Sequence, residues 1–128
     1  VDRHNTHMYK SAKYLAETLG EVPVLILVCM DRGARGPGPG PLTMGSSIYP
    51  AVQNLLLAAT GLGLGTTLTT FHTRHEEDIK TLLSIPESVE TAALIPLGYP
   101  GEGEKFGGSK RKNASDFVFY DSWGSPRQ

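Results

Sequence analysis

The stretch AVQNLLLAATGLGLGTTLTTF, residues 51–71, decides most of what the sequence predicts about the fold. Residues 51–59 are apolar on nearly every side, which is typical of a helix buried at the centre of a fold or in a subunit interface. Three alternating glycines end this helix. Residues 66–71 are then rich in threonine and end in phenylalanine, which predicts a β-strand.

Two further helices are predicted on either side of this stretch. Residues 2–19 carry one apolar stripe at helical spacing, so they predict an amphipathic helix. The central helix is expected to begin at Ser46 or Ser47, which would place Pro50 in its first turn. Residues 73–76 have the spacing of a capping box and predict a short helix through residue 83.

Three other segments predict strands. The continuous apolar run at 24–30 indicates a strand buried on both faces. Residues 91–97 indicate a core strand, with Pro96 at a sheet edge or strand end because proline donates no N–H. The aromatic segment 117–120 is strand-like and needs a sheet to join, in its own subunit or in a partner. Strands separated by helices favour an α/β or α+β fold.

The chain of 128 residues has the length of one domain, 1–128. Residues 31–47 are rich in glycine and proline and predict a long loop, and residues 101–128 predict an extended C-terminal tail. The chain begins with Val1 close to a polar helix, so we expect either processing or the later part of a longer protein.

Composition excludes several classes of protein. A single cysteine, Cys29, leaves no disulfide framework, and its place in an apolar strand predicts an inert core thiol. The net charge of -1 argues against an overall cationic nucleic-acid binder and leaves a local basic patch open. No apolar run approaches the roughly 20 residues that cross a bilayer. The chain starts without the apolar stretch of a signal peptide, so we expect the cytoplasm.

Two glycine motifs do not meet the requirements of nucleotide-binding loops. The glycines at 61–65 follow a helix and precede a strand, whereas a dinucleotide fingerprint needs the opposite order. Residues 103–110 have P-loop glycine spacing, but the serine precedes the lysine.

Basic residues leave two interpretations open. Lys110, Arg111 and Lys112 form either a solvated tail or a phosphate clamp beside flexible glycines. The histidine pairs at 4 and 7 and at 72 and 75 lack an evident third ligand, so no metal site is predicted. No nucleophile constellation is visible either.

The sequence resembles the FMN-dependent nitroreductase family. The likeness runs through residues 45–59, 61–71, 82–86 and 93–100, then the basic triplet and Tyr120 to Trp123, about three-quarters of the chain. The helix QNLLLAA followed by Gly-Leu-Gly is its most specific part.

This resemblance implies an α+β flavoprotein with a mixed sheet flanked by helices, working as an intertwined homodimer with FMN in clefts at the interface. It implies NADH or NADPH as electron donor and a small acceptor such as a nitroaromatic or quinone, reduced by ping-pong hydride transfer. FMN carries the chemistry, so no catalytic side chain is expected. The implied cofactor-binding residues are Ile48, Tyr49, Pro50, Leu68, Thr69, Thr70, Phe71, Lys110, Arg111 and Lys112.

Two segments typical of the family's N-terminal part, Arg-Arg-Ser-x-Arg and Ser-x-x-Asn-x-Gln-Pro-Trp, do not occur in the sequence. The resemblance therefore implies an N-terminally truncated, C-terminal portion of such a fold. The alternative to an oxidoreductase is a truncated, non-catalytic module that dimerises or binds flavin.

Overall fold

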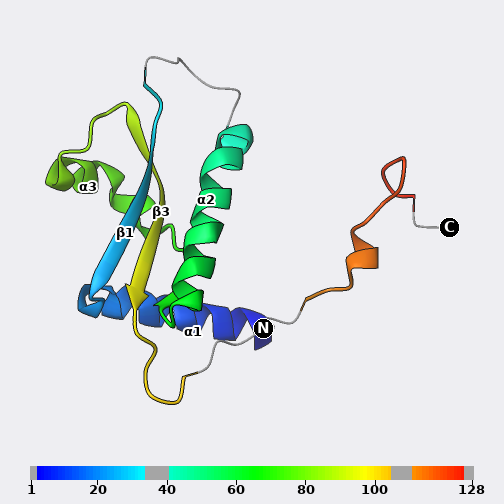
Figure 1. Ribbon diagram of the computed structural model, residues 1–128, viewed down its shortest axis with the longest axis horizontal. Coiled ribbons are helices and arrows are strands. Elements are labelled where there is room, and N and C mark those ends of the chain that lie inside the picture. The colour runs from blue at the N-terminus through cyan, green and yellow to red at the C-terminus, as the bar shows by residue number, and fades with distance from the viewer. Residues whose placement is uncertain (1–2, 34–40, 105–110, 126–128) are drawn as a thin grey trace.

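The computed structural model describes residues 3–33, 41–104 and 111–125. Figure 1 shows the arrangement of the elements. In chain order they are α1 (Arg3–Thr18), the 3-10 turn η1 (Leu19–Glu21), β1 (Val24–Asp31), α2 (Pro41–Gly61), β2 (Gly65–Thr66), the 3-10 turn η2 (Phe71–His75), α3 (Glu76–Leu83), β3 (Val89–Gly98) and the 3-10 turn η3 (Ala114–Asp116).

The three strands form one antiparallel sheet in the order β1-β3-β2. The predicted strands at 24–30 and 91–97 are both present, and the α+β class is confirmed. The expectation that the first of them is buried on both faces is wrong. β1 is an edge strand of the described sheet, and Val24 and Leu25 are 46% and 45% exposed.

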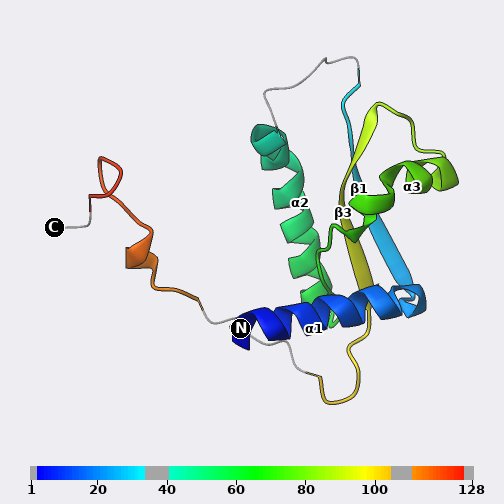
Figure 2. The ribbon, with the colours of Figure 1, turned by 180° about the vertical axis from the view of Figure 1, so that it is seen from behind.

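Helices cover both faces of the sheet. Successive residues of β3 point to opposite faces, so neighbouring residues of this strand contact different helices. Ala93 and Ile95 pack with Val52 of α2 in the main core. Leu94 points the other way and lines a cavity with residues of α1 and α3. Seen from behind in Figure 2, α1 crosses the lower end of the strands, and α3 lies on the same side.

Helix α2 begins earlier than predicted. It starts at Pro41, so the predicted loop 31–47 is too long, and its residues 34–40 lie outside the described part of the chain. Pro50 consequently lies in the helix body rather than in the first turn. Proline at position 41 suits a helix start, since its fixed φ fits the first turn and its missing N–H would find no partner there.

Only one face of α2 is buried, so the expectation of a helix enclosed on all sides is not met within this chain. Val52 and Ala59, seven residues apart, are buried, whereas Leu57 is 60% exposed. No described helix is both long enough and apolar enough to cross a membrane.

The predicted strand over 66–71 is shorter than expected. β2 comprises Gly65–Thr66, and Thr69 forms an isolated bridge with Leu94. Continuing the register of β2 places Pro96 opposite Thr67. Because proline has no N–H to return, the ladder is interrupted there. Pro96 thus lies in the central strand, and its predicted place at an edge or strand end is wrong.

The predicted capping box does not form. α3 begins at Glu76, and its N-cap, His75, makes no side-chain cap hydrogen bond. The hydroxyl of Thr73 donates instead to the carbonyl of Thr70 within η2. The carboxylate of Glu76 accepts hydrogen bonds from Thr91 of β3, so tertiary contact takes the group that the local pattern assigned to a cap.

The C-terminal segment 111–125 forms turns rather than the predicted strand. Figure 1 shows it in orange and red, away from the sheet and its helices. Residues 117–120 are exposed and belong to no described strand, and the N–H of Tyr120 donates to the carbonyl of Ser125 within the same turn. The ring centres of Phe119 and Trp123 are 5.1 Å apart with the two ring planes tilted by 55°, yet Trp123 is 93% exposed. A strand needs a neighbouring edge, and this segment lies beside none.

Candidate functional site

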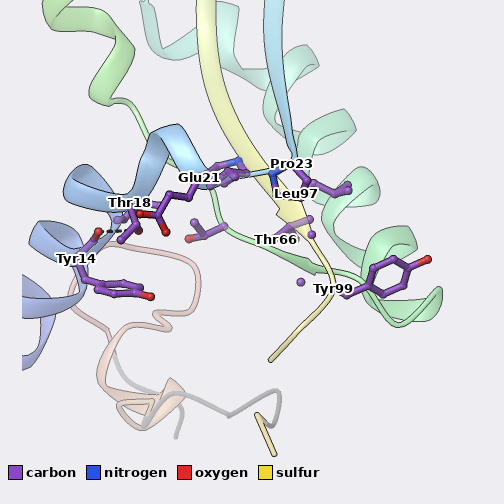
Figure 3. A pocket seen from close by; sticks show the side chains of 13 residues that line it. Tyr14, Thr18, Glu21, Pro23, Thr66, Leu97 and Tyr99 are labelled. Carbon is purple, nitrogen blue, oxygen red and sulfur yellow. Dashed lines mark hydrogen bonds between the residues drawn. The ribbon is translucent and has the colours of Figure 1, made fainter. Parts of the chain in front are cut away.

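A groove follows the outer edge of the sheet between β2 and α1. Its first part is a cavity of about 410 Å³. In Figure 3, Tyr14 and Thr18 on α1 lie on one side of the hollow, Leu97 and Tyr99 on the other, and Thr66 between them. The hydroxyl of Thr18 donates to the carbonyl of Tyr14, so it is held by its own helix.

The second part of the groove, about 450 Å³, continues along the same segment. Its walls are Ser11, Ala12 and Leu15 of α1 together with residues 67–71. Leu15 and Thr67 line both hollows, so the two parts are contiguous. The combined groove is long enough to follow the whole segment from Gly65 to Phe71.

Backbone groups in the segment 67–71 face this groove. The N–H and C=O of Thr69 both pair with Leu94 of β3, at 2.9 Å each. Neighbouring residues of an extended chain present these groups to the opposite side, so the N–H and C=O of Leu68 and the N–H of Thr70 point away from β3. Thr70 itself, with ψ of 20°, leaves the extended conformation. The carbonyl of Thr70 accepts from the N–H of Thr73. The amides of Leu68 and Thr70 donate no hydrogen bond within the described residues.

This edge can bind a flat polar ligand. An unpaired strand edge offers donors and acceptors at fixed spacing, and β-pairing holds the segment from behind. The groove walls are mostly apolar, with one carboxylate, that of Glu21, at the far end. Such a lining suits orientation of a ring system by backbone hydrogen bonds.

The predicted cofactor residues fall into three separate places. Leu68, Thr69, Thr70 and Phe71 line the groove together. Ile48, Tyr49 and Pro50 lie on α2 and border neither part of it. With a helical rise of about 1.5 Å per residue, Tyr49 is about 18 Å along α2 from the end that leads to β2.

Tyr49 is fixed in position by two contacts. Its hydroxyl donates to the carbonyl oxygen of Ala92 at 3.2 Å, which ties α2 to β3. Its ring lies against Gly45, where a Cβ would come within 2.9 Å of the ring. The side chain is therefore held rigidly while 45% of Tyr49 remains exposed.

The two described residues of the basic triplet do not line the groove. Arg111 and Lys112 belong to the exposed C-terminal segment, and Lys110 lies outside the described residues. The ammonium of Lys112 is 5.5 Å from the centre of the Phe117 ring, a cation–π contact within the segment itself. In a single chain, the three groups of predicted site residues are not brought together.

Sequence patterns did not indicate the polar network beneath α3. Glu76 Oε1 accepts from the N–H of Thr91 at 3.0 Å and from its hydroxyl at 2.6 Å, and Lys80 Nζ lies at 3.7 Å. The hydrogen bond from the Thr91 hydroxyl lowers the pKa of Glu76 most, the hydrogen bond from the Thr91 amide comes next, and the positive charge of Lys80 lowers this pKa further. No local signal identifies this network, because its partners are 15 residues apart.

Cys29 pairs with Thr91 across the sheet and is exposed, so its prediction as a core thiol is wrong. Burial of the sulfur raises the pKa of the thiol, and the negative charge of Glu76 raises it further. That the Cys29 thiol is chemically inert stays a prediction, and its physical basis is now the raised pKa of the thiol rather than a place in the core.

The fold and the groove define an α+β protein with a groove along one edge of its sheet. The family model described as "Nitroreductase family" matches residues 1–99, and the chain belongs to this family.

A curated relative from Methanothermobacter thermautotrophicus, named "Putative NADH dehydrogenase/NAD(P)H nitroreductase", is 38% identical over 105 residues. The match covers 80% of this chain and 52% of that protein, so the chain spans about half the length of this relative.

Two solved structures share the fold. A protein of the same name from Parabacteroides distasonis has a TM-score of 0.62 at 26% identity, covering 84% of this chain and 61% of that one. An oxidised iodotyrosine deiodinase, solved with FMN and 3-iodo-L-tyrosine, has a TM-score of 0.57 at 24% identity, covering 87% and 58%.

Proposed function

We propose that the chain provides the edge-strand half of an FMN site in an NAD(P)H-dependent oxidoreductase. The observation that carries this proposal is the outward-facing backbone of Leu68 and Thr70, held from behind by the pairing of Thr69 with Leu94. Membership of the nitroreductase family supports it. The FMN in the deiodinase structure shows that this fold accommodates a flavin.

FMN, when bound, supplies the hydride chemistry: it accepts a hydride from NADH or NADPH and reduces a nitroaromatic, quinone or similar acceptor in a ping-pong cycle. The residues of this chain position the ring. The amides of Leu68 and Thr70 are placed to donate hydrogen bonds to ring acceptors, and Phe71 and Leu15 give the groove an apolar wall. Hydrogen bonds to a flavin tune its reactivity and fix which face stays open.

A homodimer would bring the separated site residues together. Tyr49 and Arg111 lie away from the groove of their own chain, because neither residue lines either part of it. The exposed Leu57 on α2 offers apolar surface for such a contact. We therefore propose that a second subunit contributes Ile48, Tyr49, Pro50 and the phosphate-binding Lys110, Arg111 and Lys112.

We also propose that the protein works in the cytoplasm.

The test uses two variants at one position. Leu68→Pro removes the amide donor and Leu68→Ala keeps it, while both remove the leucine side chain. We expect the proline variant to bind FMN at least tenfold more weakly than the alanine variant, as measured by quenching of flavin fluorescence. Equal dissociation constants for the two variants would contradict the assigned role of the Leu68 amide.

Turnover separates the enzyme from a binding module. We expect purified protein with FMN to oxidise NADH or NADPH when a quinone is added, and to elute as a dimer. Flavin binding without any oxidation of either donor would instead favour the alternative, a non-catalytic flavin-binding or dimerising module.

A further inference from the structure

A third cavity, which we call the His72 cavity, lies on the other side of α1 from the first part of the groove. Its volume is about 600 Å³, within the range of small-molecule sites. It is enclosed by α1, η2, α3 and Leu94 of β3. It shares Ala12 and Phe71 with the groove but does not include residues 67–70, on which the proposed flavin site depends.

His72 is the distinctive polar residue of this cavity. It is only 3% exposed, and neither Nδ1 nor Nε2 has a hydrogen-bond partner among the described residues. A neutral imidazole carries one N–H donor and one acceptor, and leaving either unpaired in a buried place is costly. Glu76, the nearby carboxylate, is already engaged by Thr91 and Lys80. His72 lines the cavity, and a small movement of its ring that exposes one nitrogen would let a ligand atom supply the missing hydrogen bond.

The charges around the cavity have one sign. Among the residues that the structure describes, the ionisable side chains that line it are Tyr9, Lys13, His72, Arg74 and His75, and no carboxylate does. Lys13 lies 3.7 Å from Glu17, but both side chains are largely exposed, and such surface pairs hold a lysine only weakly. His75 faces Asp78 in a similarly exposed pair. Arg74 and Lys13 are therefore both fixed positive charges at the cavity, and an anion complements them.

The remaining walls are apolar. Ala16, Leu19, Phe71, Ile79 and Leu94 provide most of the surface. A ligand that satisfies both kinds of wall has a flat or aliphatic body with a single anionic group. We propose that the His72 cavity binds a small aromatic carboxylate, with the carboxylate held by His72 and Arg74 and the ring packed against Phe71 and Leu94.

Binding of 2-naphthoate to the full chain, measured by calorimetry without flavin, tests this site. The neutral isostere 2-naphthamide keeps the ring system and removes the charge. We expect 2-naphthoate to bind at least tenfold more tightly than the amide. Equal affinities, or no detectable binding of 2-naphthoate, would overturn the proposal.

Variants then locate the site. Arg74→Gln is expected to weaken 2-naphthoate binding at least fivefold, and His72→Phe at least tenfold. Lys10→Gln is the matched control, because Lys10 lies on the same helix as Lys13 but does not line the cavity. A Lys10→Gln effect as large as that of Arg74→Gln would show general charge attraction and overturn the site.

His72→Phe also has a readout that is independent of the ligand. It removes two unpartnered buried nitrogens while keeping a flat ring, so we expect the thermal midpoint to stay level or rise. If His72→Phe does not fold, the affinity of Arg74→Gln for 2-naphthoate tests the site by itself, because Arg74 is exposed and its replacement leaves the core intact. Unchanged affinity in Arg74→Gln would then refute the proposal.

Discussion

Glu76 and Thr91 are joined by two hydrogen bonds to one oxygen, at 3.0 Å from the amide and 2.6 Å from the hydroxyl. This contact fastens the first turn of α3 to the central strand. The side chain of Glu76 is only 29% exposed, so water replaces these bonds poorly. The pair therefore links the part of the chain that carries the His72 cavity to the sheet that carries the groove.

Replacing Glu76 by glutamine keeps an acceptor oxygen and removes its charge, so it should destabilise the protein by about 1–1.5 kcal/mol, the difference between hydrogen bonds to charged and to neutral acceptors. The free energy of unfolding in urea measures the loss. Glu77→Gln, on the exposed neighbouring residue, is the matched control and should stay within about 0.5 kcal/mol of the wild type. Similar losses in both variants would show that the charge of α3, not the Thr91 contact, is responsible.

Stability should also fall in acid because of this residue. The folded pKa of Glu76 lies below that of an unfolded glutamate, about 4.3. The stabilisation of the fold by ionised Glu76 is therefore complete above the pKa of the unfolded state. It is lost as the pH falls through the lower pKa of the folded state. Unfolding measured from neutral pH down to about pH 3 should show a smaller acid-side loss in Glu76→Gln. Parallel curves for the two proteins would contradict this linkage.

Cys29 should react slowly despite its exposure. Thiols react as thiolates, and burial of the sulfur and the charge of Glu76 both raise the pKa of Cys29. We expect Glu76→Gln to speed modification by a disulfide reagent at mildly alkaline pH. Thr91→Val, which removes a hydrogen bond but keeps the Glu76 charge, separates this effect from loosening of the fold. If Cys29 is modified equally faster in both variants, the faster reaction comes from loosening of the fold and not from the lost charge of Glu76.

The Tyr49 hydroxyl should contribute modestly to holding α2 on the sheet. Tyr49→Phe removes its hydrogen bond to Ala92 and should cost about 0.5–1.5 kcal/mol of unfolding free energy. The ring stays, so packing against Gly45 is retained. A loss of that size in thermal or urea unfolding supports the assignment, and no loss would mean that water replaces the bond fully.

Gly45→Ala provides a separate test of the same region. In an unobstructed helix interior, this change gains about 0.8–1 kcal/mol. Here the new Cβ would meet the Tyr49 ring at 2.9 Å, so the gain should vanish or reverse. In a Tyr49→Ala background the obstruction is gone, and the gain should reappear. The same effect of Gly45→Ala in both backgrounds would refute the contact.

Much of the fold follows from local sequence patterns. The stripe of apolar residues predicted α1 to within two residues of its observed bounds, and the apolar runs at 24–30 and 91–97 located β1 and β3. These predictions succeed because the spacing of apolar side chains depends only on the helix or strand that carries them.

Other features required the sheet order. Nothing local in VLILVCM shows that β1 is an edge strand, and Pro96 shows no sign of belonging to the central one. Capping-box spacing predicted a local role for Glu76, yet Thr91 takes its carboxylate. In each case a partner distant in sequence outweighs the local preference.

The sequence by itself determined the main helices and strands, the α+β class and the segment 68–71 as a candidate binding edge. The tertiary structure alone decided that the amides of Leu68 and Thr70 face outward, because the pairing of Thr69 with Leu94 sets that direction. It also decided that His72 is buried while His75 is exposed. Direction and burial depend on contacts between distant segments, and residue spacing along the chain does not specify those contacts.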